Sequence, residues 1–217
     1  MTEQINKTIT NLKKNNFNAI FCEDIQSAKE TALSIIAEGS TVAVGGSVTL
    51  NELGILDSIK SGNYNYLDRN KEGLTRPEIE EIFRNSFFAD YYLSSSNAVT
   101  EDGELYNVDG NSNRIAAIAF GPKKVIIIVG KNKIVKNLDE AVVRVKSIAA
   151  PKNTKRLNCD TYCKLKGHCV SIENGTDTEI GKGCNSDDRI CVNTLISAWQ
   201  RNKDRTTVII VNETLGY

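Results

Sequence analysis

The stretch Lys124-Val125-Ile126-Ile127-Ile128-Val129-Gly130 decides the fold class of this chain. Residues 125–129 form an apolar run without polar alternation, which is typical of a parallel strand buried on both faces. Gly130 ends the run. Because such a strand needs helices on both sides of its sheet, the stretch predicts an α/β protein with a mostly parallel sheet.

The sequence before and after this strand alternates in the same way. Helical apolar spacing is found over residues 3–15, 24–38, 47–60, 75–88, 111–120 and 138–150, and strand-like runs over 18–22, 41–44, 64–67 and 90–93. Asp102-Gly103 predicts a tight hairpin between 98–100 and 104–106. Pro151 is expected to end the last helix, so residues 1–151 are predicted to form one α/β domain.

The character of the chain changes after Pro151. Residues 152–191 are polar and weakly periodic, and they contain five of the six cysteines. We interpret them as a cysteine-rich metal or cluster loop. Residues 192–199 and 206–211 are expected to be two strands joined by a turn, so that residues 192–217 complete the domain.

Composition excludes several classes of function. Lys and Arg total 27, as do Asp and Glu, so no excess of positive charge indicates binding to nucleic acid or to an acidic membrane surface. No apolar run approaches the roughly 20 residues of a membrane span. The polar N-terminal stretch does not resemble a signal peptide, so we expect a cytoplasmic protein. In that reducing compartment cysteines are more often metal ligands or reactive thiols than disulfides.

The five clustered cysteines predict a metal centre. Their spacing is Cys159-x3-Cys163-x5-Cys169-x14-Cys184-x6-Cys191. Ordering a segment with so few apolar residues costs about 1–2 kcal/mol per residue in backbone entropy, and thiolates bound to a metal would offset that cost. The spacing leaves an iron–sulfur cluster and a zinc site open, with free thiols and disulfides as further alternatives. His168 is either an additional donor or a solvated side chain, and Cys22 is expected to be a buried core residue.

The turn Gly45-Gly46-Ser47 follows a strand and precedes a helix. Free backbone N–H groups and a positive helix end at such a turn suit a phosphate or carboxylate. In this interpretation Ser47 and Thr49 donate hydrogen bonds to the anion and Glu52 acts as acid, base or orienting carboxylate. The alternative is that Thr49 and Glu52 form a capping box.

A second polar segment, residues 94–114, lies between a strand and a helix. Its candidate ligand-binding residues are Asn97, Thr100, Glu101, Asn107, Asp109, Asn113 and Arg114. Parallel sheets bind ligands at the carboxyl ends of their strands, so we expect this segment to face the glycine turn across a pocket. Local turn chemistry is the alternative explanation for its Asn, Asp and Gly residues.

Four stretches of the sequence together resemble the lactate-utilization (LUD) domain family. They are residues 45–55, residues 97–114, Gly121-Pro-Lys-Lys-Val125 and Gly130-Lys-Asn-Lys133, and the resemblance covers about residues 1–155 and 208–217. It implies a fold like that of sugar-phosphate isomerases and CoA-transferases. It also implies an accessory role beside partner subunits in the oxidation of lactate to pyruvate.

One branch of that family has a C-terminal pattern similar to Cys-x5-Cys-x2-Cys-x6-Cys. Cys163 and Cys169 match its first pair and Cys184 and Cys191 its last, while the middle spacing is x14 instead of x2. The resemblance therefore implies that these four thiols hold an iron–sulfur cluster of the [4Fe–4S] type, with zinc as the alternative metal. Cys159 is an alternative to one of the four.

Together these observations predict an accessory protein of lactate, or 2-hydroxy acid, oxidation. Its cluster would transfer electrons or help to assemble an oxidoreductase complex, and its partners would be other subunits of that system, a small anionic ligand and a second copy of the chain. The alternative is a non-catalytic metabolite-binding or scaffolding module with a structural zinc. Isomerase or CoA-transferase chemistry through Glu52 or Glu101 rests on fold analogy alone.

Overall fold

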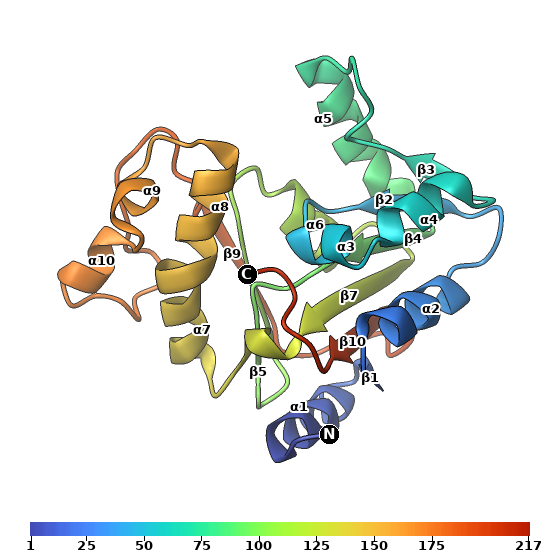
Figure 1. The fold of residues 1–217 in the computed structure, drawn as a ribbon, viewed down its shortest axis with the longest axis horizontal. Coiled ribbons are helices and arrows are strands. Elements are labelled where there is room, and N and C mark those ends of the chain that lie inside the picture. Colours follow the sequence, from blue (N-terminus) through green and yellow to red (C-terminus); the bar gives the residue numbers. More distant parts are fainter.

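The computed structural model describes all residues 1–217 and contains two sheets (Figure 1). The strands of the first are β1 (Asn18–Cys22), β2 (Thr41–Val44), β3 (Asn65–Leu67), β4 (Tyr91–Ser94), β7 (Lys124–Gly130) and β10 (Thr206–Val211). They are all parallel, in the order β1-β10-β7-β4-β2-β3. This confirms the predicted α/β class with its mostly parallel sheet.

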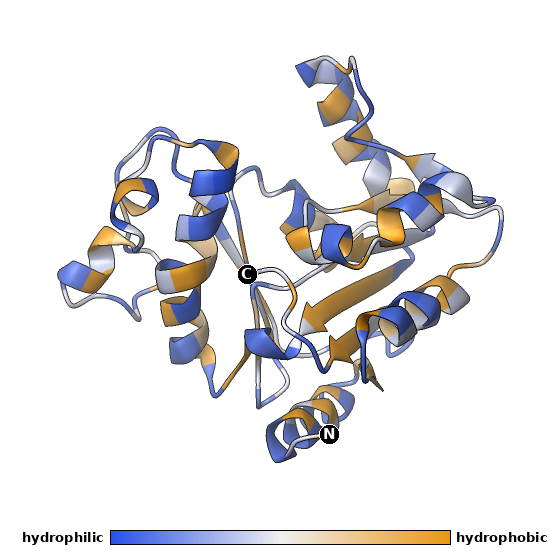
Figure 2. Ribbon diagram, in the orientation of Figure 1, coloured by the Kyte–Doolittle hydropathy of each residue, from blue (hydrophilic) through white to orange (hydrophobic).

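Helices cover both faces of the six-stranded sheet. Helices α1 (Glu3–Lys14) and α6 (Asn113–Ala119) pack on one face, and α2 (Ile25–Ile35), α3 (Val48–Glu52) and α4 (Ile55–Ser61) pack on the other. Along β7, Ile127 and Val129 face the first set while Ile126 and Ile128 face the second. The apolar run is thus buried on both faces, as predicted, and Figure 2 shows β7 as almost uniformly hydrophobic.

One predicted helix is in fact two. The pattern over residues 47–60 predicts a single helix, but Gly54 adopts a left-handed conformation with φ of +63° and separates α3 from α4. Helix α5 (Arg76–Asn85) has the predicted capping box of Thr75 and Glu78 and projects away from the sheet (Figure 1).

A second lobe contains the cysteine segment. Its sheet is formed by β5 (Ala98–Thr100), β6 (Leu105–Asp109), β8 (Ile134–Val135) and β9 (Asn193–Ser197), in the order β8-β5-β6-β9. Helices α7 (Leu138–Arg144), α8 (Ala150–Leu157), α9 (Tyr162–Lys166) and α10 (Val170–Glu173) complete the lobe (Figure 1). The predicted hairpin of β5 and β6 is confirmed.

Pro151 does not end the helix, so that prediction is wrong. The π turn Val145–Ala149 connects α7 to α8, and the chain stays helical until Asn158, which has φ of +58°. Proline lacks the N–H that an interior helical residue donates, but it is tolerated in the first turn of a helical segment. The π turn places Pro151 in such a position at the start of α8.

The two final strands exist but do not form the expected hairpin. β9 pairs antiparallel with β6 in the second lobe, whereas β10 lies between β1 and β7 in the centre of the large sheet. Every residue of β10 is buried, because helices cover both faces of the large sheet and β1 and β7 cover both edges of the strand. No helix has the length and apolar character required to cross a membrane.

Candidate functional site

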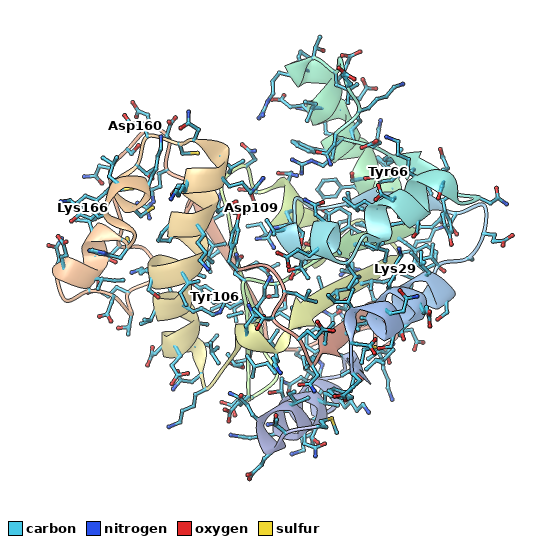
Figure 3. All side chains as sticks on the ribbon, in the orientation of Figure 1. Lys29, Tyr66, Tyr106, Asp109, Asp160 and Lys166 are labelled. Carbon is cyan, nitrogen blue, oxygen red and sulfur yellow. The ribbon has the colours of Figure 1, made fainter.

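The strand order reverses between β2 and β4, because β3 lies on one side of β2 and all later strands of the large sheet lie on the other. In parallel sheets, ligands bind at such a reversal, beyond the carboxyl ends of the strands. A cleft of about 610 Å³ lies at this position; we call it the polar cleft. Its charged lining residues are Arg69, Asp109, Arg114, Lys133, Arg156, Asp187, Asp188 and Arg189. Figure 3 shows Asp109 between the two lobes.

The glycine turn forms one edge of the polar cleft. Gly46 and Ser47 line it, whereas Gly45 is buried behind them: a Cβ on Gly45 would lie 3.0 Å from both Arg114 Cγ and Tyr92 OH. Ser47 Oγ accepts a hydrogen bond from the Leu50 N–H (3.3 Å), so Ser47 is the N-cap of α3. The turn therefore uses glycine because a neighbouring arginine and tyrosine pack against its backbone.

Thr49 and Glu52 do not form the capping box that their spacing suggests. The helix begins two residues too early for Thr49 to cap it, and Thr49 is fully buried. Glu52 instead accepts a hydrogen bond from the Gly216 N–H (2.6 Å). Farther along this C-terminal segment, the Tyr217 hydroxyl accepts a hydrogen bond from Arg156 Nε (2.8 Å). Residues 215–217 thus connect α3 with α8 beside the polar cleft.

Arg114 organises the wall formed by the central polar segment. Its Nη1 donates to Asn107 Oδ1 (2.7 Å) and to the Ser95 carbonyl (3.2 Å). Its Nη2 donates to Asn97 Oδ1 (3.0 Å) and to the Val108 carbonyl (2.7 Å). Its Nε lies 3.6 Å from an oxygen of Asp109. All four N–H groups of the two terminal nitrogens have protein acceptors, so the guanidinium stabilises the wall rather than offering a free donor.

The other predicted residues of this segment divide into two groups. Asn97, Asp109 and Asn113 line the polar cleft, and Asn107 is buried behind it. Thr100 and Glu101 do not line it. Thr100 Oγ1 donates to Glu104 within the hairpin (2.8 Å), and Glu101 pairs with Lys7 of α1 (2.8 Å). The structure thus brings the glycine turn and most of the central segment together.

Lys133 is a residue of the polar cleft that our sequence interpretation did not select. It lies three residues beyond the end of β7, its side chain is 3% exposed, and it forms no ion pair. Its Nζ donates to Thr49 Oγ1 (2.8 Å) and Ser95 Oγ (3.0 Å). Burial, with smaller contributions from nearby Arg144 and Arg114, lowers the pKa of Lys133 to about 7. Its position at the carboxyl end of the most apolar strand is the sequence signal that could have found it.

The cysteine segment encloses a second cavity, of about 470 Å³, which we call the thiol cavity. It is lined by Cys163, Cys169, Cys184 and Cys191, and more than half of its lining residues are hydrophobic. Burial raises the pKa of Cys191 to about 12, and the other three thiols contribute to the increase. The four predicted ligands therefore lie close enough to interact. Cys159 instead lines the polar cleft.

The thiols surround the thiol cavity rather than meeting at one point. No three His, Cys, Asp or Glu side chains are arranged to hold a single metal ion. Around one tetrahedral zinc, with Zn–S bonds of ~2.3 Å, thiolate sulfurs would lie about 3.8 Å apart. His168 bonds to Glu173 (2.9 Å between Nε2 and Oε1) and does not line the cavity. Cys22 is a buried core residue, as expected.

The two cavities share one wall, which contains Arg189, Ile190, Cys191 and Val192. The Arg189 side chain donates to the carbonyls of Cys191 (2.9 Å) and Cys184 (3.2 Å) and so fixes both cysteines relative to each other. Cys191 therefore lines the polar cleft as well as the thiol cavity.

A sequence profile of the LUD domain matches residues 5–211. The chain belongs to the LUD domain family. The matched range includes the polar cleft residues from Gly46 to Val192 and all four thiols of the thiol cavity. Membership supports a role related to lactate utilization. A search of curated proteins finds no match.

Three solved structures illustrate what this LUD domain is similar to. A DUF162 family protein from Deinococcus radiodurans shares 13% identity over 96% of this chain and 94% of its own, with a TM-score of 0.49. Ribose 5-phosphate isomerase A from Methanocaldococcus jannaschii shares 17% over 54% of this chain and 55% of its own (TM-score 0.35). The eIF2B delta subunit from Chaetomium thermophilum shares 20% over 61% of this chain and 51% of its own (TM-score 0.35). The chain thus spans about half the length of the last two.

Proposed function

We propose that this LUD domain holds a [4Fe–4S] cluster on Cys163, Cys169, Cys184 and Cys191 and acts in the oxidation of lactate or a related 2-hydroxy acid. The observation that supports this proposal best is the lining of one largely apolar cavity by these four thiols. When bound, the cluster supplies one-electron transfer. The protein would then pass electrons between the oxidation site and partner subunits, or hold those subunits together.

The donor set and the shape of the thiol cavity fit a cluster. A [4Fe–4S] cluster takes four cysteine thiolates around a volume, whereas a single zinc needs them around a point. The high pKa of Cys191 means that its thiol remains protonated near neutral pH unless a cation compensates the charge. Metal ligation deprotonates a thiol outright, so a bound cluster would stabilise the thiolate form of Cys191 instead of the protonated form.

Lys146 is part of the wall of the thiol cavity and supports the cysteine segment. Lys146 is 5% exposed, and its Nζ donates to the carbonyls of Thr176 (3.1 Å) and Glu179 (2.6 Å). It thereby ties the long stretch between Cys169 and Cys184 to the π turn. Cys169 and Cys184 are only half-buried, which places the cavity near the surface, where electron exchange with a partner is favourable.

The polar cleft supports the second half of the proposal, a small organic anion as ligand. Five cationic side chains line it against three anionic ones. Because it shares a wall with the thiol cavity, a bound 2-hydroxy or 2-oxo acid would lie beside the segment that holds the cluster.

Anaerobic purification followed by a visible spectrum and iron, sulfide and zinc analysis of one sample tests the proposal. We expect broad visible absorption and about four irons and four sulfides per chain. Cys184→Ser and Cys191→Ser should lose them, while the matched controls Cys159→Ser and Cys22→Ser should retain them. About one zinc without colour would instead support a scaffolding module with structural zinc, and absence of any metal would overturn both.

A further inference from the structure

Lys133 is a buried amine that forms no ion pair within the protein. We infer that Lys133 receives the negative charge of a small carboxylate or phosphate that binds in the polar cleft. This inference deepens the proposed function, because it names the group that would hold the anionic ligand.

The contacts of Lys133 leave one donor for a ligand. An ammonium group has three N–H donors, and two of them are used by Thr49 Oγ1 and Ser95 Oγ. Thr49 in turn donates to the Leu215 carbonyl (3.4 Å) and Ser95 to the Ser96 carbonyl (3.4 Å). Both hydroxyls therefore present lone pairs to the amine, and the third N–H has no acceptor in the protein. Lys133 lines the polar cleft, where a ligand oxygen could accept that hydrogen bond.

The charged groups around Lys133 do not neutralise it. Arg144 and Arg114 are cations, and both donate to protein acceptors: Arg144 bonds to the carbonyls of Asn97 (2.6 Å) and Asn132 (3.2 Å). Glu52 is the one acid that influences Lys133, and it acts from a distance: its carboxylate bonds to the Gly216 N–H and forms neither a hydrogen bond nor an ion pair with the amine. Unlike Arg144, Lys133 lines the polar cleft. Its third N–H has no acceptor in the protein, so an anionic ligand in the cleft would supply both the missing acceptor and a neutralising charge.

This arrangement links anion binding to proton uptake. With a pKa of about 7 in the free protein, Lys133 is about half protonated at neutral pH. A bound anion favours the ammonium form and raises that pKa. Affinity should therefore be constant well below pH 7 and fall about tenfold for each pH unit above it, with uptake of about 0.9 proton per anion at pH 8.

Titration calorimetry of the purified full chain between pH 6 and 9 tests the inference with pyruvate, L-lactate and inorganic phosphate as probes. Two buffers of different ionisation enthalpy at each pH yield the number of protons taken up. Binding of pyruvate or lactate assigns a carboxylate site, and binding of phosphate alone assigns a phosphate site. Pyruvate and lactate do not titrate in this pH range, so their proton uptake belongs to the protein.

Variants of two neighbouring lysines separate the buried amine from general surface charge. Lys133→Met should weaken binding about tenfold or more and remove its pH dependence. Lys131→Met is the matched control, because Lys131 lies in the same short turn but is exposed and bonds to Asn212 (3.2 Å). It should change neither property.

The inference is overturned if none of the three anions binds at millimolar concentration, if Lys133→Met binds as well as the wild type, or if binding takes up no proton. If Lys133→Met does not fold, the proton uptake of the wild type still decides. Iron and sulfide analysis of the same samples keeps the two proposals apart: a protein without a cluster that binds anions with proton uptake refutes the cluster alone.

Discussion

Replacing Arg114 by methionine should destabilise the protein strongly, even though the arginine lines a ligand cleft. The side chain is 12% exposed and donates four hydrogen bonds, two to the amides of Asn97 and Asn107 and two to backbone carbonyls. A hydrogen bond from a charged group contributes about 1.5–3 kcal/mol. Part of the loss is offset because Asn97 Oδ1 keeps the Val108 N–H (2.9 Å) and the buried charge itself disappears. We expect a net loss of about 4 kcal/mol.

Urea denaturation followed by circular dichroism measures this loss. Arg76→Met is the control: Arg76 is exposed on α5 and pairs only with Glu80, so the urea midpoint should not change. If Arg114→Met lost less than about 1 kcal/mol of stability but abolished anion binding, the guanidinium would act on the ligand and our assignment of Arg114 to the wall would be wrong.

Three further predictions concern the rest of the fold. Gly103 has φ of +84°, and a Cβ there would lie 2.5 Å from the backbone carbon of Asn11. Gly103→Ala should therefore lower the temperature of the unfolding midpoint by several degrees. An unchanged midpoint would contradict the close approach of α1 and the hairpin. Lys123 and the Thr41 N–H lower the pKa of Asp90, so its contribution to stability is present at neutral pH and is lost as the pH falls through that lowered pKa. The urea midpoint of Asp90→Asn should therefore depend less on pH between pH 5 and 2 than that of the wild type, and parallel profiles would refute this. If the thiol cavity holds the proposed cluster, its removal by a chelator should make residues 158–191 sensitive to protease while β1 to β7 stay protected. Equal cleavage with and without chelator would show that the segment orders itself.

Local pattern was enough to predict the elements of the large sheet. The unbroken apolar run predicts β7, and the apolar residues from Thr41 up to the glycine turn predict β2. Both signals depend only on residues that are close in the sequence. The pairing of β9 and β10 could not be predicted in this way. Two adjacent strands in a chain usually pair with each other, but β10 is apolar throughout and lies in the large sheet, where helices cover both faces, whereas β9 is partly exposed on the second lobe.

The candidate site was predictable by region but not by side chain. The glycine turn and the segment from Asn97 to Arg114 do meet across one cleft, because both follow strands at the reversal of strand order. The roles within it depend on tertiary packing. Arg114 bonds to protein acceptors in the cleft wall. Lys133 is buried, with a lowered pKa, because Thr49, Ser95 and the segment around Gly216 pack around its amine.

The central position of β10 also determines when the large sheet can be completed during synthesis of the chain. This strand pairs with β1 and β7 in the middle of the large sheet, yet it follows the whole cysteine segment in the chain. On the ribosome, β1 and β7 emerge long before the strand that joins them, so the sheet stays in two parts until residues 206–211 appear. All five thiols of the second lobe have by then left the exit tunnel. If the thiol cavity holds the proposed cluster, its metal can be delivered before the sheet closes, and the last step of folding then completes the large sheet beside a lobe that is already loaded.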